Sequence, residues 1–249
     1  MAERCAVAPT ATAPAATRSY RYAVYFSPRR GTPWALAGAD WLGRCIDGEA
    51  EPVQCTPAGW SATDFAALTA EPARYGWHAT LKAPFRLTAD EAETRLFDAV
   101  RDLAAGVRAF ELPPMALQRL GDFLALQPQS PCPQLQALAD ACVTTLQPFA
   151  APLNVAELAH HRRHGLSPRQ ETSLQWWGYP FVFDDFRFHM TLTGRLTELA
   201  ADRVAELHEH ARRHFAELPQ PLRIGALSIF VEPQAGVPFR RAATFELAP

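Results

Sequence analysis

Two short motifs in the chain pair a histidine with a threonine two residues later. They are His78-Ala-Thr-Leu81 and His189-Met-Thr-Leu192. Every second side chain of an extended strand points to the same face, so each histidine shares a face with its threonine. Imidazole can take up or release a proton near neutral pH, and a hydroxyl can donate a hydrogen bond. Together the two pairs provide a base, an acid and two donors, which suits phosphodiester hydrolysis.

The same alternation predicts which neighbouring side chains accompany each motif. Lys82 is expected beside His78 and Thr80, while the apolar residues between them point to a core. Further polar residues are expected on the face of His189 and Thr191: Arg187, Thr193 and Arg195. Each strand then presents imidazole, hydroxyl and cation on one face.

A single His-x-Thr motif is commonly an ordinary strand sequence, but here the surrounding order repeats. Each motif is followed by a predicted helix, a Glu-Leu-Pro segment and two predicted strands. The segments are Phe110-Glu-Leu-Pro113 and Ala216-Glu-Leu-Pro219. This repetition favours a functional role and predicts an α/β or α+β chain of two related lobes. Approximate two-fold symmetry would bring the two polar faces together.

The length and composition are those of a folded protein. Of the 249 residues, 48% are hydrophobic and 20% are charged, enough for one large domain or two small lobes. We expect a flexible tail at 1–18 and one bilobal domain at 19–249. The tail is rich in alanine, no apolar run approaches the length of a membrane span, and the tail lacks the apolar centre of a secretion signal. These features predict a cytoplasmic protein with no membrane partner.

The charge and cysteine content exclude several classes of partner and cofactor. Lys and Arg total 24 against 26 Asp and Glu, so the net charge of −2 gives no general attraction for long nucleic acid. The five cysteines are scattered without a C-x-x-C pair, which indicates neither a disulfide framework nor a zinc knuckle. We expect no cofactor, and a small molecule as the main partner.

The local pattern predicts alternating strands and helices. Strands are expected at 21–26, 76–87, 115–120, 123–127, 186–196, 223–231 and 239–247. Helices are expected at 33–46, closed by Asp47-Gly48, at 134–147 and at 197–218, with a possible short one within 49–74. Another is expected to begin at a capping box, Thr88-Ala-Asp-Glu91, and to end near Val107.

Longer stretches around the motifs carry a family resemblance. They are Arg21–Phe26, Arg74–Arg86, Trp177–Phe181 and Phe186–Arg195. These stretches resemble the two-histidine (2H) phosphodiesterase superfamily, in particular its branch associated with bacterial phosphonate-utilisation operons, and the likeness covers about residues 20–249. It implies a two-lobed α+β fold with internal duplication, pseudo-two-fold symmetry and a cleft between the lobes. It also implies hydrolysis of cyclic phosphates without a metal.

This resemblance implies a substrate class and catalytic residues. Carbon–phosphorus cleavage in that pathway yields 5-phosphoribosyl 1,2-cyclic phosphate, which a cyclic phosphodiesterase would open. We expect His78, Thr80, His189 and Thr191 to be catalytic, with His189 favoured as the base and His78 as the acid. A second phosphate on this substrate calls for additional cations. The candidate substrate-binding residues are Lys82, Arg86, Arg187, Arg195, Tyr22, Tyr25, Tyr179, Arg162 and Arg163.

Other functions and other residues compete with this interpretation. One alternative is a nucleoside 2′,3′-cyclic or RNA-end phosphodiesterase, and another is a binding module without turnover. His160 and His164 lie one helical turn apart, as metal ligands can, but two arginines crowd them and no acidic third ligand is present. The segment 160–169 is expected to be a phosphate-binding basic face or a solvated helix face. Trp177 is expected in the core, and His208, His210 and His214 on a helix surface.

Overall fold

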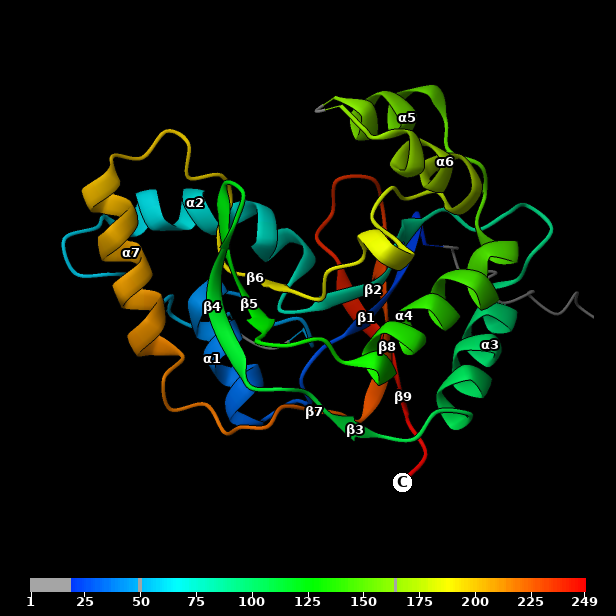
Figure 1. The fold of residues 1–249 in the computed structure, drawn as a ribbon, viewed down its shortest axis with the longest axis horizontal. Helices are drawn as coiled ribbons and strands as arrows, with labels where there is room; N and C mark the ends of the chain where they lie inside the picture. Colours follow the sequence, from blue (N-terminus) through cyan, green and yellow to red (C-terminus); the bar gives the residue numbers. More distant parts are fainter. Residues whose placement is uncertain (1–18, 49–50, 164) are drawn as a thin grey trace, which may run out of the picture.

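A seven-stranded antiparallel sheet organises the chain in this computed structural model, which describes residues 19–48, 51–163 and 165–249 (Figure 1). The strand order is β4-β5-β6-β2-β1-β8-β9, and β3 pairs with β7 in a second, two-stranded sheet. The strands are β1 Arg21–Phe26, β2 Ala79–Phe85, β3 Phe110–Glu111, β4 Met115–Leu120, β5 Phe123–Pro128, β6 Met190–Thr191, β7 Arg223–Ile224, β8 Ala226–Glu232 and β9 Arg240–Glu246. The tail expected at 1–18 lies outside the described residues.

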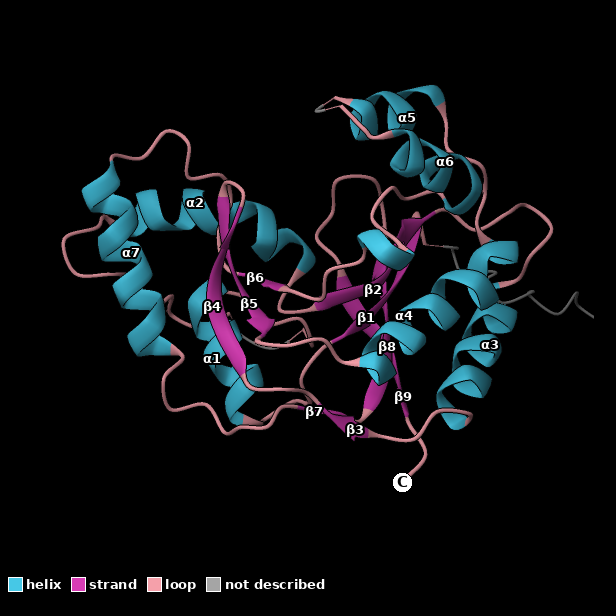
Figure 2. Cartoon of the chain, viewed as in Figure 1, coloured by secondary structure: helices cyan, strands magenta, loops and turns pink. Residues whose placement is uncertain are grey.

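Seven α-helices are found in the described part of the chain, and they divide between two ends of the sheet (Figure 2). The helices are α1 Pro33–Leu42, α2 Ala62–Tyr75, α3 Glu93–Ala105, α4 Pro133–Leu146, α5 Val155–Arg162, α6 Pro168–Trp177 and α7 Ala201–His214. Short 3-10 turns occur at Gln147–Phe149 and Phe183–Asp185. Helix α7 contacts β4 and α1 packs against α2 at one end, whereas α3 packs on β8 and β9 and α4 on β2 at the other. No helix among these is long and apolar enough to cross a membrane.

The predicted duplication is visible in the order of the sheet. Strands β2 and β6 lie side by side at its centre, and each is followed by a helix, a short strand and a hairpin. Hairpin β4-β5 extends the sheet from β6, and hairpin β8-β9 extends it from β2 through β1. The mixed fold with an antiparallel sheet confirms the expected α+β class. The counterpart of β3 is its partner β7, however, and not the expected Ala216–Pro219, which follows the end of α7.

Two apolar clusters cover the opposite faces of the sheet. Val24 and Ile229 belong to a large cluster that also contains buried residues from most of the helices. Tyr25 and Phe230, the next residues along β1 and β8, belong to a small cluster on the other face. The alternation of a strand explains this division. The small cluster forms part of the face on which the candidate site lies.

Several element boundaries differ from the sequence prediction. Helix α1 ends at Leu42 because Gly43 adopts a left-handed conformation there, before the expected stop at 47–48. The predicted capping box at Thr88 is wrong, since α3 begins at Glu93 after Ala92. The Thr88 backbone N–H instead donates to the carbonyl of Phe149 at 2.9 Å, a long-range bond that local sequence does not reveal. The possible helix within 49–74 is the full helix α2.

The strand expected at 186–196 is reduced to β6. Before it, Phe186 donates its N–H back to Phe183 at 2.9 Å in a turn. After it, Gly194 donates to the carbonyl of Leu68 on α2 at 2.7 Å, which takes the chain off the sheet. The helix expected from Thr197 begins only at Ala201, because the residues before it form a turn.

Two histidines of α7 were wrongly predicted to lie on its surface. His210 is half-buried, with its ring stacked on Trp41 at 5.4 Å. His214 donates from Nε2 to the carbonyl of Ala37 at 2.8 Å. His208 alone of the three is exposed, as expected. These rings fill the contact between α1 and α7.

Candidate active site

The register of β2 and β6 brings the two histidine motifs together. Ala79 pairs with Met190 in an antiparallel ladder, and both side chains are fully buried in the large cluster. One residue further in each direction, the same register sets His78 across from Thr191 and Thr80 across from His189. Directly opposite side chains in such a ladder have Cβ atoms about 4.5–5.5 Å apart. The four polar side chains therefore gather on the face opposite the large apolar cluster.

Both imidazoles are held by the same backbone contact. His78 Nδ1 lies 2.8 Å from the carbonyl oxygen of Gly76, and His189 Nδ1 lies 2.7 Å from that of Arg187. A carbonyl only accepts, so the N–H of each neutral ring is on Nδ1 and the lone pair is on Nε2. The hydroxyl of Thr80 lies 3.3 Å from Nε2 of His78 and can donate to it. Each ring thus has its basic nitrogen, Nε2, on the side away from the backbone carbonyl that holds it.

Gly76 is required for the contact that orients His78. It ends α2 with φ +81° and ψ −179°, a conformation that L side chains rarely adopt. A Cβ on this residue would lie 2.1 Å from Cγ2 of Ile46. The glycine therefore lets the chain turn sharply enough to place its carbonyl beside the imidazole.

An aromatic ring from the neighbouring strand packs against each histidine. Tyr25 on β1 stacks on His78 with ring centroids 3.9 Å apart, and Phe123 on β5 lies 5.7 Å from His189. Strand β1 is next to β2 and β5 is next to β6, so the two contacts follow the same pseudo-two-fold relation. Tyr75 adds a further ring at 6.1 Å from His78.

Burial lowers the basicity of both rings. It lowers the pKa of His78 to about 4, opposed by the bond to Gly76 and assisted by the nearby charge of His189 when that ring is protonated. Burial also lowers the pKa of His189, again opposed by its carbonyl contact. Both imidazoles are therefore neutral in the free protein at pH 7. An anion bound between them would favour protonation of one ring.

Comparison with known proteins identifies the family. Residues 80–240, well over half of the chain, match the family described as "Protein of unknown function (DUF1045)". The chain belongs to this family.

Two curated relatives of the DUF1045 chain share most of its length. A protein of Janthinobacterium sp. (strain Marseille) is 44% identical over 222 residues, which are 88% of this chain and 49% of the relative. A protein of Laribacter hongkongensis (strain HLHK9) is 40% identical over 221 residues, 88% of this chain and 50% of the relative. Both are named "Ribose 1,5-bisphosphate phosphokinase PhnN". The chain spans about half the length of these relatives.

Solved structures give more distant similarities. E. coli LigT complexed with 3′-AMP is 13% identical, with a TM-score of 0.41, and the match covers 93% of this chain and 100% of LigT. A structure described as a phosphoesterase is 12% identical, with the same TM-score and the same two coverages.

Lys82 does not lie beside the histidines of the DUF1045 chain, so that expectation was wrong. Tyr25 pairs with Thr80, but its neighbour Val24 pairs with Lys82, which leaves Leu81 as an extra residue in β2. Such a bulge interrupts the alternation. Because Tyr25 and Val24 point to opposite faces, Thr80 and Lys82 do so as well. Lys82 is buried, and its Nζ donates to Gln147 Oε1 on the 3-10 turn after α4 at 2.9 Å.

Three other predicted cations are held by their own neighbours. Arg86 forms a two-pronged contact with Glu157, with both N···O distances 3.1 Å. Arg187 is exposed, and its guanidinium donates to the carbonyls of Asp184 and Phe186 at 2.9 and 2.7 Å. Arg195 lies 3.4 Å from the carboxylate of Asp122. The backbone carbonyl of Arg187 contacts His189.

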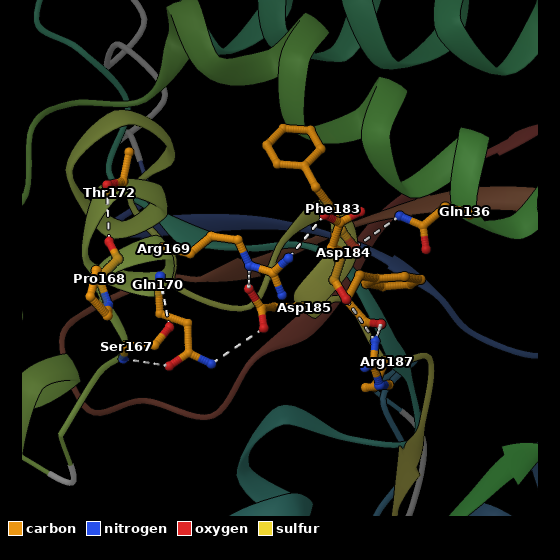
Figure 3. A network of polar contacts seen from close by, with 11 residues as sticks. Gln136, Ser167, Pro168, Arg169, Gln170, Thr172, Phe183, Asp184, Asp185 and Arg187 are labelled. Atoms are coloured by element: carbon orange, nitrogen blue, oxygen red, sulfur yellow. Dashed lines mark hydrogen bonds and ion pairs between the residues drawn. The ribbon is translucent and has the colours of Figure 1, made fainter.

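A polar network fixes the segment that precedes His189 (Figure 3). Arg169 on α6 pairs with Asp184 at 3.0 Å and with Asp185 at 2.9 Å. Gln136 on α4 donates to the carbonyl of Phe183 at 3.1 Å. Two helices thus hold the turn at Phe183–Asp185, which lies just before the Arg187 carbonyl that orients His189.

The three predicted tyrosines have different environments. Tyr22 is fully buried in the large cluster, on the face opposite the histidines, so the structure does not place it at the site. Tyr25 stacks on His78, and burial raises its pKa well above the usual value. Tyr179 is half-buried, and burial raises its pKa to about 12 with a contribution from Tyr75. Tyr25 and Tyr75 contact His78, and Tyr179 is close enough to influence the pKa of Tyr25; these three residues are called the tyrosine cluster.

The basic segment 160–169 is not one helix, because α5 ends at Arg162 and α6 begins at Pro168. Arg162 pairs with Glu171 on α6, with Nε to Oε2 at 3.0 Å, and Arg163 is exposed at the end of α5. His161 packs against Tyr179 with centroids 5.7 Å apart, whereas His160 is exposed. His164 is not among the described residues. No group of three or more potential metal ligands occurs in the described part.

Two arginines that sequence reasoning missed lie next to the tyrosine cluster. The fully buried carboxylate of Glu232 binds Arg21 and, at 2.7 Å, Arg74. The Arg74 guanidinium lies 5.8 Å from the ring centre of Tyr75. Two guanidiniums share one carboxylate, which leaves net positive charge beside the phenols. The signal in the sequence is that Arg21 and Arg74 begin the two family-like stretches at 21–26 and 74–86.

Proposed function

We propose that this DUF1045 chain is a metal-independent cyclic phosphodiesterase that uses two-histidine acid/base catalysis. The supporting observation is the pairing of His78 and Thr80 with His189 and Thr191 across β2 and β6. Each ring is fixed through Nδ1, so the two Nε2 atoms remain for proton transfer. The threonine hydroxyls are half-buried on the same face, where they can donate to nonbridging phosphate oxygens.

The electrostatics favour His78 as the base, which reverses the assignment preferred from sequence. A base must be unprotonated, and His78 is the ring whose pKa burial lowers to about 4. His78 Nε2 would take a proton from water as the water oxygen forms a bond to phosphorus. The bond from phosphorus to the leaving ring oxygen breaks, and protonated His189 would donate its Nε2 proton to that oxygen.

The names of the relatives support one substrate. Hydrolysis of 5-phosphoribosyl 1,2-cyclic phosphate with the O2 atom as leaving group produces ribose 1,5-bisphosphate. That product is the compound in the names of both relatives. The present sequence contains no Gly-x4-Gly-Lys phosphate loop. We therefore assign kinase activity to the part of the relatives outside the match, and cyclic phosphate hydrolysis to the part that this chain represents.

The distal phosphate of this substrate requires positive charge at some distance from the reacting ring. Arg74 lies 5.8 Å from the ring centre of Tyr75 in the tyrosine cluster, and Arg21 shares the carboxylate of Glu232 with it. Guanidinium groups bind phosphate through paired donors. We assign these two arginines to the 5-phosphate, in place of the lysine and arginines expected from sequence.

A comparison of two substrates tests this function. The specificity constant for 5-phosphoribosyl 1,2-cyclic phosphate should exceed that for adenosine 2′,3′-cyclic phosphate. Addition of a metal chelator should leave both specificity constants unchanged. His78→Gln and His189→Gln should each reduce turnover roughly a hundredfold to ten-thousandfold, the range for one general acid or base. His208→Gln, on an exposed part of α7, is the control. Near-normal rates in both folded site variants would refute the mechanism.

The same assay separates the substrates. Arg74→Met should reduce the difference between the specificity constants for the two substrates, because binding energy from a remote phosphate also orients the reacting ring. Arg101→Met, on the surface of α3, is the matched control. Equal or better turnover of the nucleotide would favour the alternative nucleotide function, in which the phenols beside His78 stack on a base. Tight binding without turnover of either compound would favour a binding module.

A further inference from the structure

A pocket of about 380 Å³ lies between the end of β2, the end of α4 and helices α5 and α6. Its lining includes Lys82, Gln147, Arg162 and Trp177. The bulge at Leu81 turns Lys82 away from the face that carries Thr80 and the histidines. The pocket is therefore on the side of the sheet opposite the candidate active site.

The buried positive charge in the lining of this pocket is that of Lys82, because the guanidinium of Arg162 pairs with Glu171. Lys82 is the only lysine in the 249-residue chain, and it is 4% exposed. The pocket-lining residues include Lys82 and Arg162 but no Asp or Glu among those the structure describes. The acceptors of the Lys82 ammonium are neutral, namely Gln147 Oε1 at 2.9 Å and the Val143 carbonyl at 3.5 Å. An ammonium has three donors, so this contact set leaves capacity for an anion.

A buried ammonium without a carboxylate is costly for folding. Burial lowers the pKa of Lys82 to about 8, which leaves most of the population protonated at pH 7. Removal of a charge from water destabilises the folded state unless an opposite charge compensates. Departures from favourable local chemistry of this kind are expected at functional sites. An anionic ligand would supply the missing charge.

The remaining walls of the pocket are largely apolar. Phe85 and Leu174 line it together with Trp177. The volume is in the range of small-molecule sites, about 300–1,000 Å³. These walls suit a ligand that carries a hydrocarbon or ring portion as well as an anionic group.

We propose that this pocket is a second binding site, separate from the histidine face, for a small organic anion. Its carboxylate or phosphate group pairs with Lys82, and its apolar part lies against Trp177. The assignment does not depend on the proposed hydrolysis, because none of these residues belongs to the catalytic face.

Calorimetric titration of the whole chain tests the site with three probes of similar size. Benzoate and phenyl phosphate carry the two anionic groups, and benzyl alcohol is the neutral control. At least one anion should bind about tenfold more tightly than benzyl alcohol, and Lys82→Met should abolish that difference. Arg101→Met should leave it unchanged. Comparison of the two anions identifies the preferred group.

Two further measurements separate this pocket from the active site. The double variant His78→Gln, His189→Gln should bind the preferred anion as the wild type does. The anion should also slow acetylation of Lys82, measured by mass spectrometry, with the N-terminal amine as the internal reference. Thermal unfolding establishes that Lys82→Met is folded. Three results would overturn the proposal. They are equal affinity for benzyl alcohol and the anions, unchanged anion affinity in folded Lys82→Met, and an acetylation rate of Lys82 that saturating anion does not reduce.

Discussion

The phenol ring of Tyr25 stacks on the imidazole of His78, with centroids 3.9 Å apart and an angle of 28° between the planes. This contact covers one face of the imidazole, while the bond to the Gly76 carbonyl occupies Nδ1. Loss of solvent around the ring disfavours its protonated form. Tyr25 therefore helps to keep His78 neutral and ready to accept a proton.

The dependence of kcat/KM on pH should report this contact. A base works only when unprotonated, so activity should fall as pH decreases through the pKa of His78, which burial lowers to about 4. Tyr25→Leu should shift this acid limb toward the ordinary histidine value, because water reaches the ring. Phe123→Leu, which changes the surroundings of His189 instead, is the matched control. A wild-type acid limb near the ordinary value would contradict the assignment of His78 as base.

The same ring should make folding stability depend on pH. Because the folded-state pKa of His78 is lowered, the unfolded chain binds a proton first as the pH falls. The stabilisation is therefore complete above the ordinary histidine pKa and is lost as the pH falls toward 4. One proton gives a slope of at most about 1.4 kcal/mol per pH unit.

Urea unfolding at neutral and mildly acidic pH provides the measurement. His78→Gln should lose less stability on acidification than the wild type. His208→Gln should lose as much as the wild type, since this exposed residue makes no comparable contact. Parallel losses in wild type and His78→Gln would show that the His78 ring does not control the acid response.

The face that carries the two histidines was predictable from strand alternation and from the duplicated order. His78 and Thr80 share a face, and the duplicated order identifies His189 and Thr191 as their counterparts. The position of Lys82 was not predictable in the same way. The extra residue at Leu81 puts Lys82 on the face opposite Thr80. Pro84 in this central strand signals a bulge, but it does not reveal which residue is the extra one.

Long-range bonds account for the other departures. The backbone of Thr88 is bound to Phe149, which delays the start of α3. Gly194 is bound to Leu68, which shortens β6. The pairing of Arg21 and Arg74 depends on Glu232, more than 150 residues from either in the chain. Local pattern carries no information about such partners.

The threonine hydroxyls should matter for turnover more than for folding. Thr80→Val and Thr191→Val keep the shape of half-buried side chains and remove a donor to phosphate. Each should reduce kcat with little change in unfolding free energy. Thr193→Val is the control, since its buried hydroxyl accepts from the N–H of Leu124 at 3.0 Å. That variant should lose about 1–3 kcal/mol of stability. Unchanged kcat in both site variants would make Thr80 and Thr191 structural residues.

Gly38 in α1 supports the active site through Trp77, the residue that precedes His78. A Cβ on Gly38 would lie 2.1 Å from Cγ of the Trp77 ring, which is itself buried. In an unobstructed helix, Gly→Ala stabilises by about 1 kcal/mol. At Gly38 the alanine should instead destabilise the protein, because an extra methyl group in a well-packed core typically costs about 1–3 kcal/mol of stability. Displacement of Trp77 should also move His78 relative to Thr191.

Gly38→Ala should therefore lower both the urea midpoint and kcat. Gly106→Ala, at the end of α3, is the matched control, because a Cβ there meets only ordinary contacts at 3.6 Å. Its φ of −83° also suits alanine, so its midpoint should stay the same or rise. If Gly38→Ala were as stable and as active as Gly106→Ala, Trp77 would not be the support that positions His78.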